Sequence, residues 1–254
     1  VRLTGQARVV LAHASVVQAQ FERARAELAA FADGTIGTVA VAGFSTAISG
    51  LVAPAIRSLA CTRPGITVTA VEIEPPDLFT RLDSGDLDVA VAVDHRRVPP
   101  RNDPHYHRID LLSDPMEAAL PVDHPLAGAA EVELADLAGD VFVSAAPGSS
   151  CFEVTLGACA SAGFNPDVRH HSTDWHAVVS LVAAGCGVAL VPRLAQPLAR
   201  PGLVLRPLAG RGAARNIFVA VRAGAQDEPV LAATLDALIE AAHACDAAAE
   251  AVLC

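Results

Sequence analysis

The chain has few aromatic side chains, with a single tryptophan, a single tyrosine and a single methionine among its 254 residues. Six cysteines are present, but none forms a C-x-x-C pair and their spacing is irregular, which favours reduced thiols over a disulfide framework. Although 52% of the residues are hydrophobic, no apolar run approaches the roughly eighteen residues that a membrane span needs. The sequence does not open with a secretory signal. We therefore expect a cytoplasmic protein without a membrane partner.

Positive charge is also scarce, because 18 Lys and Arg residues face 28 Asp and Glu residues, for a net charge of −10. The overall field of this chain therefore does not attract nucleic acid. The G-x-S-x-G and H-E-x-x-H motifs do not occur, and Gly148-Ser149-Ser150 is not a nucleophile elbow. The paired histidines His105 with His107 and His170 with His171 have no carboxylate or cysteine at metal-ligand spacing. We expect no enzyme activity, no metal and no cofactor.

What the chain does have, in residues 3–31, is a heptad repeat of apolar side chains placed alternately three and four residues apart. Such a narrow stripe is typical of a coiled-coil seam, and four heptads make a rod of roughly 40 Å. The pattern predicts a linker and dimerisation helix over residues 1–33; the alternative is a single helix packed on its own domain. The residues that we expect at the dimer interface are Val10, Ala14, Val17, Phe21, Ala24, Leu28 and Phe31.

Short β-type segments then alternate with helical segments. The expected strands are 38–42, 66–73, 88–93, 116–120, 141–144, 168–172, 188–191 and 217–221. The expected helices cover about 47–60, 77–82, 151–162, 177–184 and the chain from about 228. This alternation predicts an α/β fold with two Rossmann-like lobes, mostly parallel sheets and a ligand cleft between them. In such sheets, ligands bind beyond the carboxyl ends of the strands.

Five stretches of the sequence resemble, in the same order, those of LysR-type transcriptional regulators. V-R-L-T-G-Q-A-R-V-V at the start resembles the beginning of that family's linker helix. G-T-I-G-T-V followed by G-F-S-T, and L-D-S-G-D-L-D-V-A, resemble segments of its effector domain. L-P-V-D-H-P-L-A resembles its "LP-x-x-HPLA" stretch, and V-A-A-G-C-G-V-A-L-V-P its "aaGxGxxxxP" signature. Together the matches cover nearly the whole chain.

The resemblance implies an effector-binding module of the type 2 periplasmic-binding-protein fold. Lobe I is expected over residues 34–112 with 210–246, and lobe II over residues 113–209. It also implies a winged helix-turn-helix domain before Val1, so that promoter DNA would be bound by that missing part. The implied partners are a small-molecule effector and further copies of the chain, in a dimer or tetramer. Packing of residues 47–60 against residues 151–162 of another copy is part of the family pattern.

Hydroxyl groups and backbone N–H groups at strand-to-helix junctions can hold a carboxylate. Ser45 with Thr46, and residues 147–150, occupy such junctions, although capping of a helix explains a Ser or Thr there equally well. Trp175 is either a wall of the cleft or a partly buried anchor. Position and resemblance together select the candidate effector contacts Phe44, Ser45, Thr46, Glu74, Asp94, Ser144, Pro147, Gly148, Ser149, Trp175 and Pro192.

Two other functions fit the same fold. A free-standing solute-binding protein would use two such lobes, but it would leave the heptad repeat without a role. A two-lobed enzyme would need catalytic residues that the motifs do not supply. We therefore expect the effector-sensing and dimerising part of a transcriptional regulator.

Overall fold

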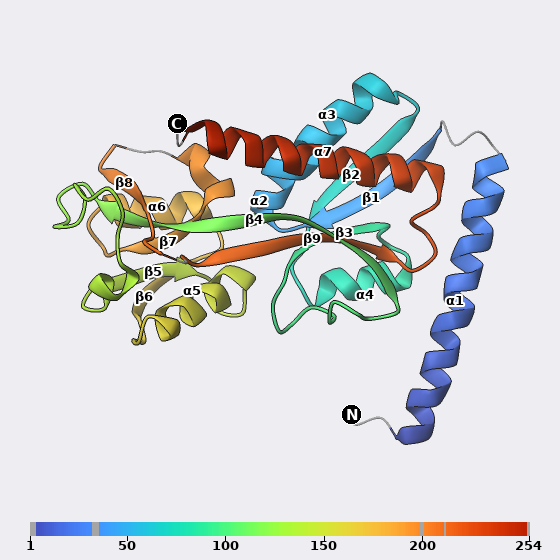
Figure 1. The fold of residues 1–254 in the computed structure, drawn as a ribbon, viewed down its shortest axis with the longest axis horizontal. Coiled ribbons are helices and arrows are strands. Elements are labelled where there is room, and N and C mark those ends of the chain that lie inside the picture. Colours follow the sequence, from blue (N-terminus) through green and yellow to red (C-terminus); the bar gives the residue numbers. More distant parts are fainter. Residues whose placement is uncertain (1–3, 32–35, 199–200, 211, 253–254) are drawn as a thin grey trace. The chain divides into compact units, whose positions relative to one another are not determined.

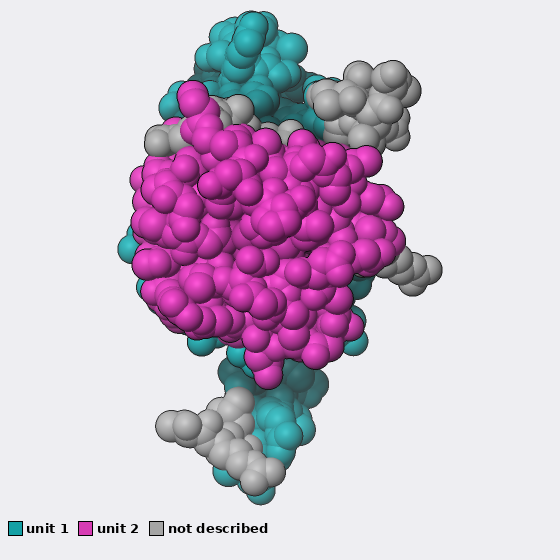
Figure 2. All heavy atoms as spheres, turned by 90° about the vertical axis from the view of Figure 1, so that its left-hand side faces the viewer, with its two compact units in different colours: residues 1–92, 96–112, 218–254 teal, residues 93–95, 113–217 magenta. Residues whose placement is uncertain are grey.

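The computed structural model describes residues 4–31, 36–198, 201–210 and 212–252. The chain forms two compact units, coloured separately in Figure 2. Unit 1 comprises Val1–Ala92, Arg96–Leu112 and Phe218–Cys254, and unit 2 comprises Val93–His95 and Ser113–Ile217. The sequence-based division places the return to the first lobe at residue 210, whereas the chain re-enters unit 1 at Phe218. The leading helix belongs to unit 1.

Two long strands, β4 (Tyr106–Pro121) and β9 (Ala214–Arg222), carry the chain from one unit to the other. The sequence predicted only the apolar end of β4, because the charged residues before it hide the strand pattern. The other elements of unit 1 are α1 (Gly5–Phe31), β1 (Gly37–Gly43), α2 (Ser45–Ala47), η1 (Ile48–Val52), α3 (Ala53–Thr62), β2 (Ile66–Glu72), α4 (Asp77–Ser84), β3 (Val89–Val93) and α7 (Pro229–Val252).

In unit 1, β1 pairs in parallel with β2 and with β3, and the order β2-β1-β3 continues to β9. Helix α7 packs against α3 and β1 (Figure 1). A hydrophobic cluster in unit 1 buries Leu78, Phe79 and Leu82 of α4 against Phe218 of β9. The guanidinium of Arg108 lies 3.6 Å from the centre of the Phe218 ring, a cation–π contact. The strand predicted at residues 88–93 is β3, whose five residues are all buried.

In unit 2 the remaining elements are η2 (Leu134–Leu137), β5 (Val141–Ala145), α5 (Ser150–Ser161), β6 (Asp167–Ser172), α6 (Trp175–Ala183), β7 (Ala189–Pro192), η3 (Arg193–Leu198) and β8 (Leu203–Pro207). Strands β5 and β6 are parallel, but β4 is antiparallel to both β7 and β8. These antiparallel pairs, and the whole of β8, were missing from the expectation of mostly parallel sheets. Helix α6 covers one apolar cluster and α5 another.

Gly187 allows the turn before β7 to pass against β5. Its φ is +145°, and a Cβ atom there would lie 2.3 Å from the carbonyl oxygen of Val141. The amide of Val143 donates to the carbonyl of Val188, and the amide of Val188 donates to the carbonyl of Val141, each at 2.8 Å. A residue with a side chain at position 187 would break this close approach.

Helix α1 exposes its heptad seam. Val10, Val17, Phe21 and Leu28 have 55–71% of their surface exposed, and Ala14 and Ala24 are also exposed. The side chain of Phe31 lies outside the described residues. Among residues 5–28 of α1, the buried residues are instead Ser15 and Ala26, which lie off the seam. Of the described helices, none combines the length and the apolar character required to cross a membrane.

Candidate functional site

In unit 1, the ends of the parallel strands bring predicted contact residues to one edge of the sheet. Gly43 at the end of β1 pairs with Glu72 of β2 and with Val91 of β3. Phe44 and Ser45 follow β1 directly, and Glu74 follows β2 at the same edge. The amide of Ile73 donates to the carbonyl of Gly43 at 3.1 Å, which fixes the two strand ends side by side.

Ser45 begins a helical stretch in which α2, η1 and α3 succeed one another without leaving helical backbone angles. Phe44 and Thr46 are buried, and Ser45 is partly exposed. The turn η1 is a π-helix, a rare variant that occurs often at functional sites. The first N–H groups of a helix have no partner within the helix, so this end favours a negatively charged group.

Two of the predicted contacts are carboxylates that face solvent. Glu74 in unit 1 and Asp94 in unit 2 are both exposed. The backbone of Asp94 is fixed, because its amide donates to the carbonyl of Asn216 at 2.8 Å. After Glu74 come Pro75 and Pro76, which supply no backbone donor.

In unit 2, the loop between β5 and α5 holds the next group of predicted contacts. Ser144 at the end of β5 is 3% exposed, and its hydroxyl oxygen is buried without a hydrogen-bond partner. Gly148 has φ of +90° and turns the chain towards the helix. Ser149 caps α5, since its hydroxyl accepts a hydrogen bond from the amide of Phe152 at 3.3 Å. Pro147 is exposed.

The ends of β6 and β7 supply the remaining predicted contacts. Ala145 of β5 pairs with Ser172 of β6, so that the loop after β6 lies at the same edge as the loop after β5. Asp174 caps α6 by accepting from the amide of His176 at 2.8 Å, and Trp175 begins the helix. Trp175 is partly buried and packs against the α6 cluster. Pro192 ends β7 and is buried.

A buried polar network beneath α5 was missed by the sequence analysis. Arg215 of β9 is 1% exposed and Asp114 of β4 is 2% exposed, and the two side chains form an ion pair. Arg215 also donates to the sulfur of Cys151, in the first turn of α5, at 3.1 Å. Burial lowers the pKa of the Arg215 guanidinium, but its contacts with Cys151 and Asp114 outweigh burial and raise that pKa. No clear signal in the sequence marks this pair, because β4 also carries Arg108, Asp110 and Glu117 and β9 also carries Arg222.

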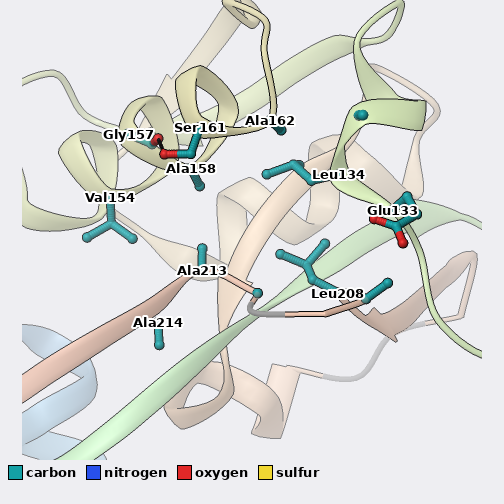
Figure 3. A pocket seen from close by; sticks show the side chains of 13 residues that line it. Glu133, Leu134, Val154, Gly157, Ala158, Ser161, Ala162, Leu208, Ala213 and Ala214 are labelled. Carbon is teal, nitrogen blue, oxygen red and sulfur yellow. Dashed lines mark hydrogen bonds between the residues drawn. The ribbon is translucent and has the colours of Figure 1, made fainter.

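Unit 2 also contains an open cavity of about 560 Å³. As Figure 3 shows, Val154, Gly157 and Ser161 of α5 line one side, and Leu208 and Ala213 line the other. Small side chains on α5 leave this space open. None of the predicted effector contacts lines it. In the described part of the chain, no group of three or more His, Cys, Asp or Glu residues is arranged to hold a metal ion.

Comparison with known proteins gives the family of the chain. The family model described as the LysR substrate binding domain matches residues 32–243. A relative from Pectobacterium carotovorum subsp. carotovorum, the hydrogen peroxide-inducible genes activator, is 30% identical over 139 residues. That match covers 55% of this chain and 44% of the relative. The chain therefore spans about half the length of this curated relative.

Solved structures show the same fold. The C-terminal domain of a probable LysR family transcriptional regulator from Rhodococcus sp. RHA1 superimposes with a TM-score of 0.67 at 25% identity, covering 80% of this chain and 98% of that domain. The BenM effector binding domain with its effector benzoate superimposes with a TM-score of 0.71 at 20% identity, covering 80% and 90%. The fold is thus that of LysR effector-binding domains, with a periplasmic-binding-protein-like architecture. The chain belongs to the LysR substrate-binding domain family.

Proposed function

We propose that this chain is the effector-sensing and dimerising part of a LysR-type transcriptional regulator, and that its effector is a small carboxylate. Promoter DNA would be bound by a separate winged helix-turn-helix domain. The candidate contacts in unit 1 are Phe44, Ser45, Thr46 and Glu74, and those in unit 2 are Asp94, Ser144, Pro147, Gly148, Ser149, Trp175 and Pro192.

The observation that carries the proposal is the buried hydroxyl of Ser144. A buried polar group without a partner costs about 1–3 kcal/mol, so proteins rarely keep one unless it serves a purpose. This hydroxyl stands at the carboxyl end of β5, where α/β folds bind their ligands. An arriving carboxylate oxygen would accept its hydrogen bond.

The charged groups near Ser144 and the start of α5 limit the charge that the effector can carry. The twelve-residue helix α5 starts directly after Ser149, and its N-terminus favours an anion. The positive charge of Arg215 is balanced by Asp114, so the network adds little net field. Asp94, an exposed carboxylate among the candidate contacts of the same unit, would repel a multiply charged anion. A singly charged carboxylate satisfies both constraints, and benzoate is the effector named for the structurally similar BenM domain.

The experiment is calorimetric titration of the purified chain with a panel of small monocarboxylates that includes benzoate. Ser144→Ala is expected to weaken binding by about 10-fold to 150-fold, the equivalent of a net hydrogen bond to a charged group. Ser161→Ala is the matched control, because its hydroxyl, at the far end of α5, bonds the carbonyl of Gly157. Failure of every carboxylate to bind, or equal binding by both variants, would refute the proposed effector class.

Self-association is the second part of the proposal. The exposed seam of α1 supplies one surface. The α5 cavity, with Glu133 at its rim, and the α3 surface, with Arg57, supply a second pair of surfaces with opposite charges. Small residues on both helices, such as Gly157 and Ala53, permit close approach of two copies.

A second candidate stimulus is peroxide, suggested by the name of the Pectobacterium relative. Cys151 favours this candidate, because its sulfur accepts a hydrogen bond from Arg215 and lies in the first turn of α5, where the helix N-terminus stabilises a thiolate. Cys159, the other cysteine of α5, opposes this candidate as a second reactive thiol, since burial raises the pKa of its thiol to about 11. The two residues are eight positions apart on one helix, about 12 Å along its axis, which is too far for a disulfide.

Peptide mass spectrometry after hydrogen peroxide treatment tests this candidate. Oxidation confined to Cys151, and abolished in Cys151→Ser, would support a thiol sensor. An unoxidised Cys151 at peroxide concentrations that oxidise the exposed Cys61 would exclude it.

A further inference from the structure

Helix α1 contacts unit 1 of its own chain through a face that is not the heptad seam. The contacting residues are Ser15, Ala19, Glu22 and Ala26, placed three and four residues apart. Ser15 and Ala26 are 9% and 2% exposed, and Ala19 and Glu22 are partly buried. At 3.6 residues per turn, the centre of this face lies roughly 150° around the helix from the centre of the seam. The two faces can therefore be occupied at the same time.

The first contact is an ion pair around a buried arginine. Arg222 at the end of β9 is 6% exposed, and its Nε donates to Glu22 of α1 at 3.1 Å. Its Nη1 donates to the carbonyls of Leu82 and Leu87 at 2.9 and 2.6 Å, and its Nη2 reaches Asp88 at 3.5 Å. Because these bonds fix the guanidinium, Glu22 meets a preformed partner, and the pair is worth more than an exposed salt bridge.

The second contact is a chain of short hydrogen bonds. The hydroxyl of Ser15 lies 2.5 Å from Nε2 of His105, and Nδ1 of His105 lies 2.6 Å from the carboxylate of Asp103. The order Ser-His-Asp matches that of a hydrolase triad, but Ser15 donates its one hydroxyl proton to the carbonyl of Leu11 at 2.8 Å, so it accepts from His105. The adjoining cavity is about 20 Å³, enough for about one water molecule and not for a substrate. These residues therefore attach the helix rather than catalyse.

The third contact is a close approach of two backbones. Gly224 has φ of +93°, and a Cβ atom there would lie 2.3 Å from the carbonyl oxygen of Ala19. Position 224 therefore accepts only glycine while α1 stays in place. Three residues of unit 1, His105, Arg222 and Gly224, therefore contact the same face of α1.

We propose that α1 is clasped to unit 1 of its own chain, so that α1 and unit 1 move as one body while the seam binds a second copy. We name the residues Ser15, Ala19, Glu22, Ala26, His105, Arg222 and Gly224 the clasp. This inference deepens the proposed regulatory function and rests on it. The clasp would couple effector binding to the coiled coil, because a change that an effector makes in unit 1 would pass directly to α1.

Cross-linking in the full chain tests the clasp. Ala19 and Ala223 line the same small cavity, so the double variant Ala19→Cys/Ala223→Cys should link within one chain on mild oxidation or with a short bismaleimide. Peptide mass spectrometry distinguishes this link from those of the six native cysteines. The matched control is Val17→Cys/Ala223→Cys, because Val17 is 55% exposed on the seam side and should not link.

Adding Gly224→Ala to the linking pair should slow link formation by about tenfold or more, the effect of at least 1.4 kcal/mol. Gly163→Ala is the control for backbone strain, since Gly163 has φ of +90° and open space around its Cβ position. It should leave the rate unchanged. Glu22→Gln provides a second variant that keeps normal backbone geometry and should also slow the link.

The outcomes separate the clasp from the proposed function. An absent link in a dimeric chain that binds carboxylates would overturn the clasp alone. A link between chains, seen as mixed-isotope peptides when labelled and unlabelled protein are combined, would also overturn it. If the intrachain link forms in the Gly224→Ala variant as fast as without this substitution, the close approach does not hold the helix. That result would contradict the proposal. Loss of dimerisation or of carboxylate binding with the link intact would count against the proposed function only.

Discussion

The guanidinium of Arg215 directs two of its nitrogens, Nε and Nη2, to the same oxygen of Asp114, and both side chains are almost fully buried. The other oxygen of Asp114 accepts from the amide of Leu194 at 3.1 Å. This ion pair connects β4, β9 and the chain that follows β7. Both residues lie in those parts of β4 and β9 that belong to unit 2.

Removing one partner of this pair should destabilise the protein strongly. We expect Asp114→Leu or Arg215→Met to lower the free energy of unfolding by about 3–5 kcal/mol, because each leaves a buried charge uncompensated. The double variant should lose less than either single variant, since no buried charge is left. Urea denaturation of the four proteins measures the coupling, and additive losses would show that the pair does not act as a unit.

Gly187 should be far more sensitive to substitution than its neighbour Gly185. Gly187→Ala places a Cβ atom 2.3 Å from the carbonyl of Val141, whereas the Cβ position at Gly185, also with positive φ, is open. We expect Gly185→Ala to cost about 1 kcal/mol and Gly187→Ala several times more. Equal melting temperatures for the two variants would contradict the close approach of β5 and the turn before β7.

The contrast between these glycines shows what the sequence could predict. The "aaGxGxxxxP" resemblance marked both glycines and Pro192, but only the structure separates the glycine needed for packing from the one needed for the turn. The repeating strands and helices were predictable, because β3 and α4 carry clear patterns. The first half of β4 and all of β8 were not, since their pairing partners are distant in sequence and decide their conformation.

The candidate site shows the same limit. Ser45, Ser144 and Ser149 were identifiable from their place between a strand and a helix, but the missing partner of the Ser144 hydroxyl was not. The heptad repeat indicated a binding face on α1. The clasp was not predictable, because Ser15, Ala19, Glu22 and Ala26 have no common chemistry and become a face only against His105 and Arg222.

The single tyrosine allows a clean test of burial in unit 1. Tyr106 donates to the carboxylate of Asp83 at 2.7 Å, and burial first, then Asp83, raises the pKa of the phenol well above its ordinary value near 10. The folded state therefore holds this proton more tightly than the unfolded state, and stability should be lost as the pH rises above about 10.

Ultraviolet absorbance at 295 nm follows Tyr106 alone, since the chain has no other tyrosine. Tyrosinate should appear only together with unfolding, as followed by circular dichroism. In urea, the same group should titrate near pH 10. A folded protein that titrates near pH 10 would contradict the hydrogen bond to Asp83.

The seam of α1 should control self-association. Phe21 is 70% exposed in the single chain, so Phe21→Glu should place a charge at the coil interface and raise the dimer dissociation constant by about tenfold or more, which corresponds to 1.4 kcal/mol. Gln20→Glu adds the same charge at an exposed position off the seam and should leave the constant unchanged. Sedimentation equilibrium measures both. A Phe21→Glu chain that associates as the unsubstituted chain does would show that the seam is not an interface.

The measurement that tests the effector site most directly is the unfolding free energy of Ser144→Ala with and without a bound carboxylate. Without the carboxylate, loss of an unpartnered buried hydroxyl should leave stability unchanged or raise it by about 1 kcal/mol. With the carboxylate, the variant should gain less stability from the ligand than the unsubstituted protein does. A variant that is destabilised when empty, or that gains as much from the ligand, would contradict a ligand-binding role for Ser144.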